Sequence, residues 1–345
     1  PHIRFLFDVD VFGERVPADA ESLDLTRAQI PDTALLMEVL SMLPALKSVD
    51  LQGYPVTFDE MDALYAAYPD IDFSFSFELF SQQVTSQAAR LELNGYPLAS
   101  VEEVADKLKY LPHLSYADLS GCGLTNEQME QLIARFPQVK FVWVIRIGAW
   151  EMRTDITAFS KGNRREFPNS MGRFLKGTYK TNLYDADIEP LKYCTDLVYL
   201  DLGHGNRLTD VSVLANLTKL KVLILSMNKI QDISPLGALK ELECLEIYQN
   251  LITDISVVAT LPKLKYLNCS STKITDASPL FGMKQLEMLW FIRNLYVSAE
   301  QRQQLKESLP DCNICFTANS SGEGGWTDNG LYVEYQTAFG LPYKK

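Results

Sequence analysis

The sequence predicts an α/β solenoid, in which short coils stack side by side and a parallel β-sheet lines the concave face of a horseshoe. Two observations predict this fold class. A 22-residue repeat runs without a gap from Leu220, and residues 5–72 align with residues 73–140 at an offset of 68, with 19 identities. A repeat of this kind buries its apolar face only against neighbouring copies. We therefore expect one elongated core rather than a globular one.

The 22-residue repeat carries a fixed frame of apolar residues. In the first gapless copy the frame is Leu220, Leu223, Leu225, Asn228, Ile230, Ile233, Leu236 and Leu239, and later copies begin at Leu242, Leu264 and Leu286. An earlier copy, one residue longer, begins at Leu197. The alternating L-x-L part predicts a short strand buried on one face, and the asparagine amide is suited to hydrogen-bonding the backbone where the chain turns. This frame is the L-x-x-L-x-L-x-x-N-x-I signature of leucine-rich repeats.

The first half of the chain predicts longer, helix-containing coils. Each 68-residue unit contains L-x-L strands and apolar segments that favour helices around residues 33–43 and 101–111. Thr57 with Glu60, and Thr125 with Gln128, have the spacing of capping boxes that open further helices. A third copy starts at Phe141 and then loses the pattern. The first half is therefore an irregular solenoid, which we expect to form one continuous body with the regular repeats.

Two segments break the repeats, so we expect four regions. These are irregular leucine-rich repeats at 1–159, a basic insertion at 160–180, regular repeats at 181–297 and a C-terminal cap at 298–345. The insertion holds six basic residues and one acidic residue, which either recognise an acidic partner or form a solvated loop. The cap combines the helix-like SAEQRQQLKESL, the strand-like CNICFT and an aromatic tail, and would cover the apolar edge of the last coil.

Composition and spacing exclude several functions. The net charge of −12 argues against nucleic acid as a partner, and no run of 18 apolar residues predicts a membrane span. The three histidines lie on unrelated segments, so no base stands near a nucleophile and we expect no enzyme. The pair Cys312 and Cys315 has no second pair, and the acids around Asp185 belong to no repeating acidic loop. We therefore expect neither a metal nor a cofactor.

The residues between the frame leucines should project from the concave face. Read across five coils, they are rich in the side chains typical of binding hot spots. The candidate partner-binding residues are Tyr199, Ile224, Met227, Tyr248, Tyr266, Met288, Trp290 and Arg293. Tyr248, Tyr266 and Trp290 would form the energetic centre of this surface. Two alternatives remain, in which the protein's own C-terminal tail or a dimer partner covers the same side chains.

The turns IQDISPL, ITDISVV and ITDASPL in residues 197–296 resemble those of bacterial internalins. The 68-residue duplication and the tail after the repeats resemble surface or secreted repeat proteins of gut Clostridia-like bacteria. These resemblances imply a non-enzymatic protein-interaction module, secreted or on the cell surface, whose leader would precede Pro1. A glycan- or cell-wall-binding module is the main alternative, because exposed Tyr and Trp also stack on sugars. A structural spacer is a third.

Overall fold

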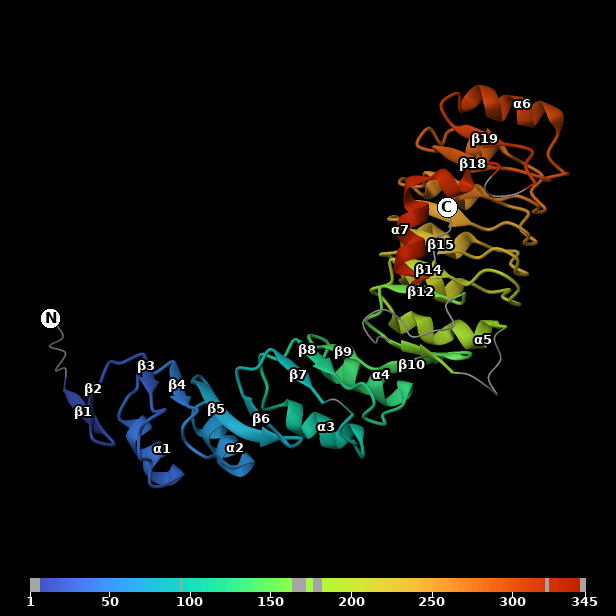
Figure 1. Ribbon diagram of the computed structural model, residues 1–345. Coiled ribbons are helices and arrows are strands. Elements are labelled where there is room, and N and C mark those ends of the chain that lie inside the picture. Colours follow the sequence, from blue (N-terminus) through green and yellow to red (C-terminus); the bar gives the residue numbers. More distant parts are fainter. Residues whose placement is uncertain (1–6, 94, 163–171, 176–181, 320–322, 342–345) are drawn as a thin grey trace, which may run out of the picture. The chain divides into compact units, whose positions relative to one another are not determined.

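The computed structural model describes residues 7–93, 95–162, 172–175, 182–319 and 323–341. The chain forms two compact units, Pro1–Val142 and Trp143–Lys345, and short strands recur along both (Figure 1). Among the described residues, every helix is too short or too polar to cross a lipid bilayer.

The N-terminal unit alternates short strands with helices, as the sequence predicts. Its strands are β1 (Asp8–Val11), β2 (Glu14–Pro17), β3 (Ser22–Asp24), β4 (Ser48–Leu51), β5 (Asp72–Leu79), β6 (Gln82–Thr85), β7 (Arg90–Glu92), β8 (Tyr116–Asp118) and β9 (Lys140–Val142). Its helices are α1 (Thr33–Ser41), α2 (Phe58–Ala67), α3 (Val101–Leu108) and α4 (Asn126–Arg135). Strands β3 to β5 pair in parallel, as do β7 to β9, whereas β1–β2 and β5–β6 are antiparallel hairpins.

Both predicted capping boxes form. The Oγ1 atoms of Thr57 and Thr125 accept hydrogen bonds at 3.3 Å from the backbone N–H groups of Glu60 and Gln128. The Glu60 and Gln128 side chains accept in return from the threonine N–H groups at 2.8 Å. The reciprocal bonds satisfy donors that a helix N-terminus otherwise leaves unpaired. The structure therefore confirms the predicted starts of helices α2 and α4.

The 68-residue repeat continues further along the chain than its sequence pattern. The β5–β6 hairpin recurs 68 residues later as β10 (Val144–Ile147) and β11 (Trp150–Arg153), and β7 recurs as β12 (Ala158–Ser160). Hydrogen bonds recur with it, because the N–H of Ser86 donates to the Phe75 carbonyl and the N–H of Thr154 to the Trp143 carbonyl, both at 2.9 Å. The residues after Phe141 therefore keep the backbone structure of the earlier copy, although they lose its sequence pattern.

The C-terminal unit is built on a seven-stranded parallel sheet. Its order is β12, β14 (Tyr199–Asp201), β15 (Val222–Ile224), β16 (Cys244–Glu246), β17 (Tyr266–Asn268), β18 (Met288–Trp290) and β19 (Asn313–Cys315). Short helical segments return the chain between strands, namely α5 (Asp185–Ile188), η2 (Glu189–Tyr193), η3 (Ser212–Asn216), η4 (Ser234–Ala238), η5 (Ser256–Thr260) and η6 (Ser278–Leu280). This arrangement confirms the predicted leucine-rich repeat fold.

The repeat frame accounts for the core of this sheet. Leu200, Leu223, Leu245, Leu267 and Leu289 lie in one register row and are fully buried. Each repeat asparagine joins two coils, as predicted. The Nδ2 of Asn250 donates to the Leu225 and Ile247 carbonyls at 3.0 Å, and its Oδ1 accepts from the Ile230 N–H at 3.1 Å. The amide thus satisfies backbone groups that the turn would otherwise bury unpaired.

The chain divides into its two compact units after Val142, and whether both sets of repeats fold as one continuous body stays a prediction. Strand β9 pairs with β8, and β12 pairs with β14, while the antiparallel hairpin β10–β11 comes between them in the chain. The predicted limits of the four regions, with the irregular repeats ending at residue 159, likewise stay predictions. Most of the basic segment lies outside the described residues. Of those described, β13 (Gly172–Phe174) pairs with β11, and Arg173 forms an ion pair with Glu151 at 3.0 Å.

The residues after the repeats do two different things. Helix α6 (Ala299–Ser308) and β19 continue the stack, and β19 pairs in parallel with β18. Both elements match the predicted helix and strand. The chain then forms η7 (Trp326–Asp328) and α7 (Gly330–Ala338). Helix α7 lies alongside the strands of the sheet rather than at its end (Figure 1). We call residues 323–341 the C-terminal segment.

Candidate ligand-binding pocket

The C-terminal segment packs across the concave face of the sheet. Trp326, Tyr335 and Phe339 form one buried cluster with the concave side chains of four strands, which are Val222, Ile224, Cys244, Tyr266, Met288 and Trp290. The Tyr199 hydroxyl donates a hydrogen bond to Glu334 of α7. The alternative in which the protein's own tail covers the aromatic stripe is therefore the arrangement in this structure.

A close contact at Gly324 holds the start of this segment against the sheet. The Nε1 of Trp290 donates to the Gly324 carbonyl at 3.3 Å, and its ring centroid lies 5.8 Å from that of Trp326. A Cβ at position 324 would lie 2.2 Å from Cζ2 of Trp290. Because no side chain fits that space, glycine is required for the backbone to approach the indole.

A cavity of about 580 Å³ remains between the C-terminal segment and the sheet. We call it the concave pocket. Aromatic walls come from both sides, and the polar lining includes carboxylates, amides and hydroxyls; the lining includes Tyr248, Trp290, Trp326, Tyr332, Tyr335, Asp201, Glu246, Asn268, Ser270 and Arg293. Its volume lies within the range of roughly 300–1,000 Å³ that is typical of small-molecule sites.

Glu246 is one of two buried acidic residues that line this pocket, the other being Asp201. Glu246 is the last residue of strand β16, and it is 8% exposed. Oε1 accepts hydrogen bonds from Trp326 Nε1 at 3.0 Å and from the Tyr335 hydroxyl at 3.4 Å. Burial raises the pKa of Glu246 to about 7, the bond from Trp326 lowers it, and the Asp201 carboxylate raises it further. Glu246 thus changes charge near neutral pH.

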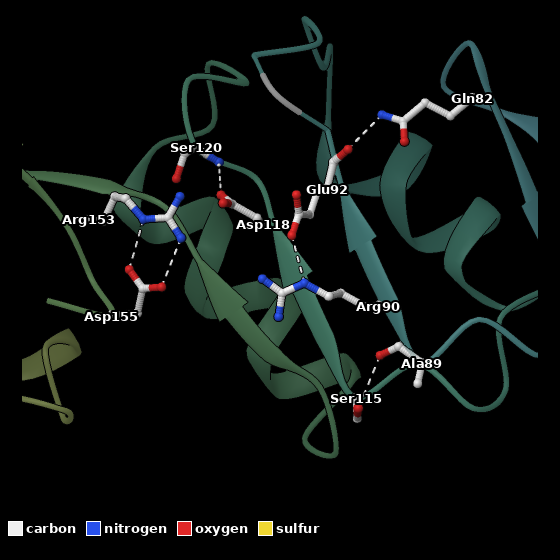
Figure 2. Close-up of polar contacts among 9 residues, drawn as sticks. All are labelled: Gln82, Ala89, Arg90, Glu92, Ser115, Asp118, Ser120, Arg153 and Asp155. Atoms are coloured by element: carbon white, nitrogen blue, oxygen red, sulfur yellow. Dashed lines mark hydrogen bonds and ion pairs between the residues drawn. The ribbon is translucent and has the colours of Figure 1, made fainter. Parts of the chain in front are cut away.

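Asp201 has a different role, although it lies in the same register row. Its Oδ1 accepts from the Gly203 N–H at 2.9 Å, and Oδ2 accepts from the Ser160 hydroxyl at 2.7 Å. The same turn recurs in the N-terminal unit, where Asp118 accepts from the Ser120 N–H at 2.9 Å (Figure 2). A short acidic side chain at a strand end therefore closes the local turn. Glu246, which is one methylene longer, reaches the C-terminal segment instead.

The structure divides the eight predicted partner-binding residues into two groups. Four are buried beneath the C-terminal segment, namely Ile224, Tyr266, Met288 and Trp290. The other four are partly or well exposed, namely Tyr199, Met227, Tyr248 and Arg293. Of the predicted centre, Tyr248 and Trp290 line the concave pocket while the segment is in place, whereas Tyr266 does not line it. Partner binding by these three residues stays a prediction, and for Tyr266 it requires the segment to move.

Two of the exposed residues, Met227 and Arg293, lie where the chain has left its strand. His204, Met227, Gln249, Ser271 and Arg293 occupy the same repeat position, and all have a positive φ between 53° and 63°. Met227, at 40% exposure, and Gln249 border a shallow groove of about 450 Å³ with Lys229, Leu251 and Lys273. Met227, Gln249 and Arg293 therefore form an exposed rim beside the concave pocket.

Other residues singled out in the sequence have local roles. Asp185 accepts hydrogen bonds from Thr209 and from the Asp210 N–H. Asp187 accepts from the Tyr184 N–H at 2.8 Å. All six cysteines are free thiols. Within the described ranges, no group of three or more histidine, cysteine or acidic residues is arranged to hold a metal ion. Of the basic residues at 160–180, Lys161 donates to the Asn206 side chain at 2.6 Å, whereas Arg164, Arg165, Lys176 and Lys180 lie outside the described residues.

Sequence reasoning missed the residues that the C-terminal segment contributes. Trp326 and Tyr335 are 80 and 89 residues from Glu246 along the chain, and no local pattern joins them. One signal was available, because Glu246 is an acidic residue in a stripe that also contains Ile224 and Trp290. A carboxylate among apolar neighbours needs a partner or a function.

Comparison with known proteins agrees with the repeat register. Residues 218–260 match the family of Leucine Rich repeats (2 copies). No curated protein sequence matches the chain. Similar solved structures include an internalin of Listeria monocytogenes, with 23% identity and a TM-score of 0.38 over 81% of this chain and 64% of that one. Others are a Leptospira interrogans leucine-rich repeat protein, with 18% identity and a TM-score of 0.37 over 81% and 74% of the two chains, and internalin C2 of Listeria monocytogenes, with 22% identity and a TM-score of 0.33 over 74% and 91%.

The chain therefore spans less than two thirds of the first internalin. The matched repeats and the seven-stranded parallel sheet together show that this chain has the leucine-rich repeat fold.

Proposed function

We propose that this protein is a non-enzymatic binding module, and that its C-terminal unit captures an exposed segment of a partner protein at the concave pocket and its rim. Leucine-rich repeats generally serve as protein-interaction modules. The observation that carries the proposal is the pocket of about 580 Å³ itself, with aromatic walls and hydrogen-bonding groups inside. Such a lining suits a side chain or short peptide segment more than a flat protein surface.

The site chemistry supports binding rather than catalysis. His204, Ser270 and Ser271 all line the pocket. Within the described part of the chain, the His204 imidazole makes no hydrogen bond to either serine, so no serine is paired with a base that would activate it. The ring faces Tyr248 instead, with centroids 6.5 Å apart.

A glycan is the second candidate ligand, and one observation favours it. The indoles of Trp290 and Trp326 line the pocket together with the Asn268 amide. Flat rings beside hydrogen-bonding groups suit a sugar, which has both apolar faces and hydroxyls.

The test is to pan a random peptide display library and a glycan array against the full chain. Ligands of the pocket should lose at least tenfold in affinity in Tyr248→Ala, and those that also touch the rim should weaken in Arg293→Ala. Tyr184→Ala is the matched control, because Tyr184 is exposed and does not line the pocket. Selection of glycans alone would favour the second candidate. If no selected ligand depends on Tyr248, the pocket is not the binding site.

We also propose that the protein is secreted or lies on the cell surface. This proposal rests on the resemblance of its turns to those of internalins. Protease treatment of intact cells that express the natural gene tests it, because a surface protein is digested without lysis. Digestion only after lysis would refute the proposal.

A further inference from the structure

The carboxylate of Glu246 has one hydrogen-bonded oxygen and one open oxygen. Both donors, Trp326 Nε1 and the Tyr335 hydroxyl, bind Oε1. Among the described residues, no donor contacts Oε2, although Glu246 lines the concave pocket. Oε2 is not sealed in the core but borders the cavity, and a donor that reached this charged acceptor would form a charge-assisted hydrogen bond. The open oxygen therefore marks a position at which a ligand donor would be favourable.

An exposed glutamate at a strand end has a partner, although it needs one less than a buried glutamate does. In the N-terminal unit Glu92 also ends a strand, and it pairs with Arg90 at 2.7 Å (Figure 2). In the C-terminal unit, by contrast, none of the described lysines or arginines forms an ion pair with Glu246. The charge that acts on it is the carboxylate of Asp201, which has the same sign and raises the pKa of Glu246. The floor of the pocket is thus negative and lacks a counter-ion from these residues.

The walls beside this carboxylate are aromatic. Trp290 and Trp326 lie 5.8 Å apart between ring centroids, and Tyr248 and Tyr335 also line the cavity. The faces of such rings carry partial negative charge and attract organic cations, most strongly at indoles and in desolvated sites. Arg293, the cation that lines the pocket, is at its exposed rim. A buried carboxylate between indole and phenol rings is the chemistry that recognises an ammonium group.

We propose that the concave pocket binds an alkylammonium group, whose charge lies at Oε2 of Glu246 and whose carbon atoms contact Trp290 and Trp326. This inference deepens the proposed function and rests on it. The ammonium group comes either from a lysine side chain of the partner protein or from a free quaternary amine. Both sources carry a positive charge that pairs with the carboxylate, although only the lysine ammonium also has N–H groups that can donate to Oε2, and the ligands below distinguish them.

The test is isothermal titration of the full chain with choline and with Nα-acetyl-lysine methylamide, at pH 8. The neutral isostere 3,3-dimethylbutan-1-ol replaces choline in a matched titration. We expect at least one ammonium ligand to bind, and the neutral isostere to bind at least tenfold more weakly. Binding of choline alone identifies a free amine as the source, and binding of the lysine derivative alone identifies a protein side chain.

Two variants tie the affinity to the carboxylate. Glu246→Gln keeps an oxygen for Trp326 and Tyr335 but removes the charge, so ammonium affinity should fall at least tenfold. Glu241→Gln removes one exposed carboxylate outside the pocket and should leave the affinity unchanged. Circular dichroism of both variants checks that the fold is kept.

Affinity should also rise as pH increases through 7, because an ammonium ion pairs with the ionised carboxylate. The titratable and charged groups that line the pocket or act on Glu246 are Asp201 on β14, Cys244 on β16, Tyr332 and Tyr335 on α7, and His204, Tyr248 and Arg293 at the strand ends. Comparing Glu246→Gln with the native protein at each pH isolates the carboxylate from these groups.

The inference is overturned if neither ammonium ligand binds, if the neutral isostere binds as tightly, or if Glu246→Gln binds equally well. The proposed function survives each of these results when selected peptides or glycans still depend on Tyr248. It fails separately when no ligand depends on Tyr248.

Discussion

Replacing Glu246 with glutamine should make the C-terminal unit more stable at neutral and alkaline pH. The unfolded glutamate has an ordinary pKa near 4.5, and burial raises the folded value to about 7. The folded state therefore binds the proton more tightly than the unfolded state. The contribution of Glu246 to the free energy of unfolding is fully present below pH 4.5, and it is lost as the pH rises through 7. Glutamine has no proton to lose, so its variant lacks this dependence.

The size of the effect follows from the shift. A change of one pKa unit corresponds to about 1.4 kcal/mol, so ionising Glu246 in place costs roughly 3 kcal/mol once the pH reaches 8. The difference in unfolding free energy between Glu246→Gln and the native protein should thus rise by about that amount from pH 4 to pH 8. The contributions of carboxylates that do not interact with Glu246 cancel in the difference.

Urea unfolding followed by tryptophan fluorescence measures this difference. All four tryptophans, Trp143, Trp150, Trp290 and Trp326, belong to the C-terminal unit, so the signal reports on that unit. The denaturant midpoint and slope at each pH give the free energy. A difference that stays flat between pH 4 and pH 8 would refute the reasoning, because it would mean that the carboxylate remains solvated in the folded protein.

Three further predictions concern stability and packing. Gly324→Ala should expose the C-terminal segment to limited proteolysis, because its Cβ would clash with Trp290, whereas Gly330→Ala meets no atom within 4 Å and should behave as native; equal cleavage rates would contradict the close contact. Trp290→Ala should lower the unfolding free energy by about 3–5 kcal/mol through the cavity that it leaves, and an unchanged stability would restore Trp290 as an exposed binding residue. Asn250→Ala leaves three buried backbone groups unpaired and should cost about 2–4 kcal/mol in urea unfolding, whereas the exposed Asn216→Ala should change it little; similar losses would contradict the role of the amide.

The parts of the fold that the sequence predicts are those specified by local signals. The 22-residue frame predicts the leucine rows and the asparagine bonds, because each position recurs within one coil. The capping boxes at Thr57 and Thr125 predict where two helices start, because each signal is contained in four consecutive residues. The hairpin β10–β11 was missed, since residues 144–153 keep the strand alternation but lose the identities with the earlier copies. Its two strands persist because the alternation of apolar residues, and not residue identity, specifies a strand.

The candidate site depends on contacts that no local pattern specifies. Alternation along β16 and β18 predicts which side chains face the concave side, and Glu246 and Trp290 do so. It does not specify what covers them. An aromatic stripe is equally favourable against a partner and against the protein's own chain, because burial of apolar area drives both. The aromatic tail was visible in the sequence, but its position over the sheet depends on contacts between residues far apart in the chain, such as Gly324 with Trp290 and Trp326 with Glu246.

The concave pocket differs from a simple intramolecular core in one physical respect. If the C-terminal segment served only to cover apolar surface, a leucine in place of Glu246 would pack against Trp326 and Tyr335 without the cost of burying a charge. Instead, the row Asp201, Ile224, Glu246 keeps a carboxylate whose ionisation opposes folding at neutral pH. Buried positions of a strand are normally apolar, and Glu246 breaks this rule beside an open cavity. A function is expected at such a position. An ammonium ligand would stabilise the ionised carboxylate, so ionisation of Glu246 would no longer oppose folding. Binding of the ligand would then add to the stability of the state in which the C-terminal segment covers the sheet.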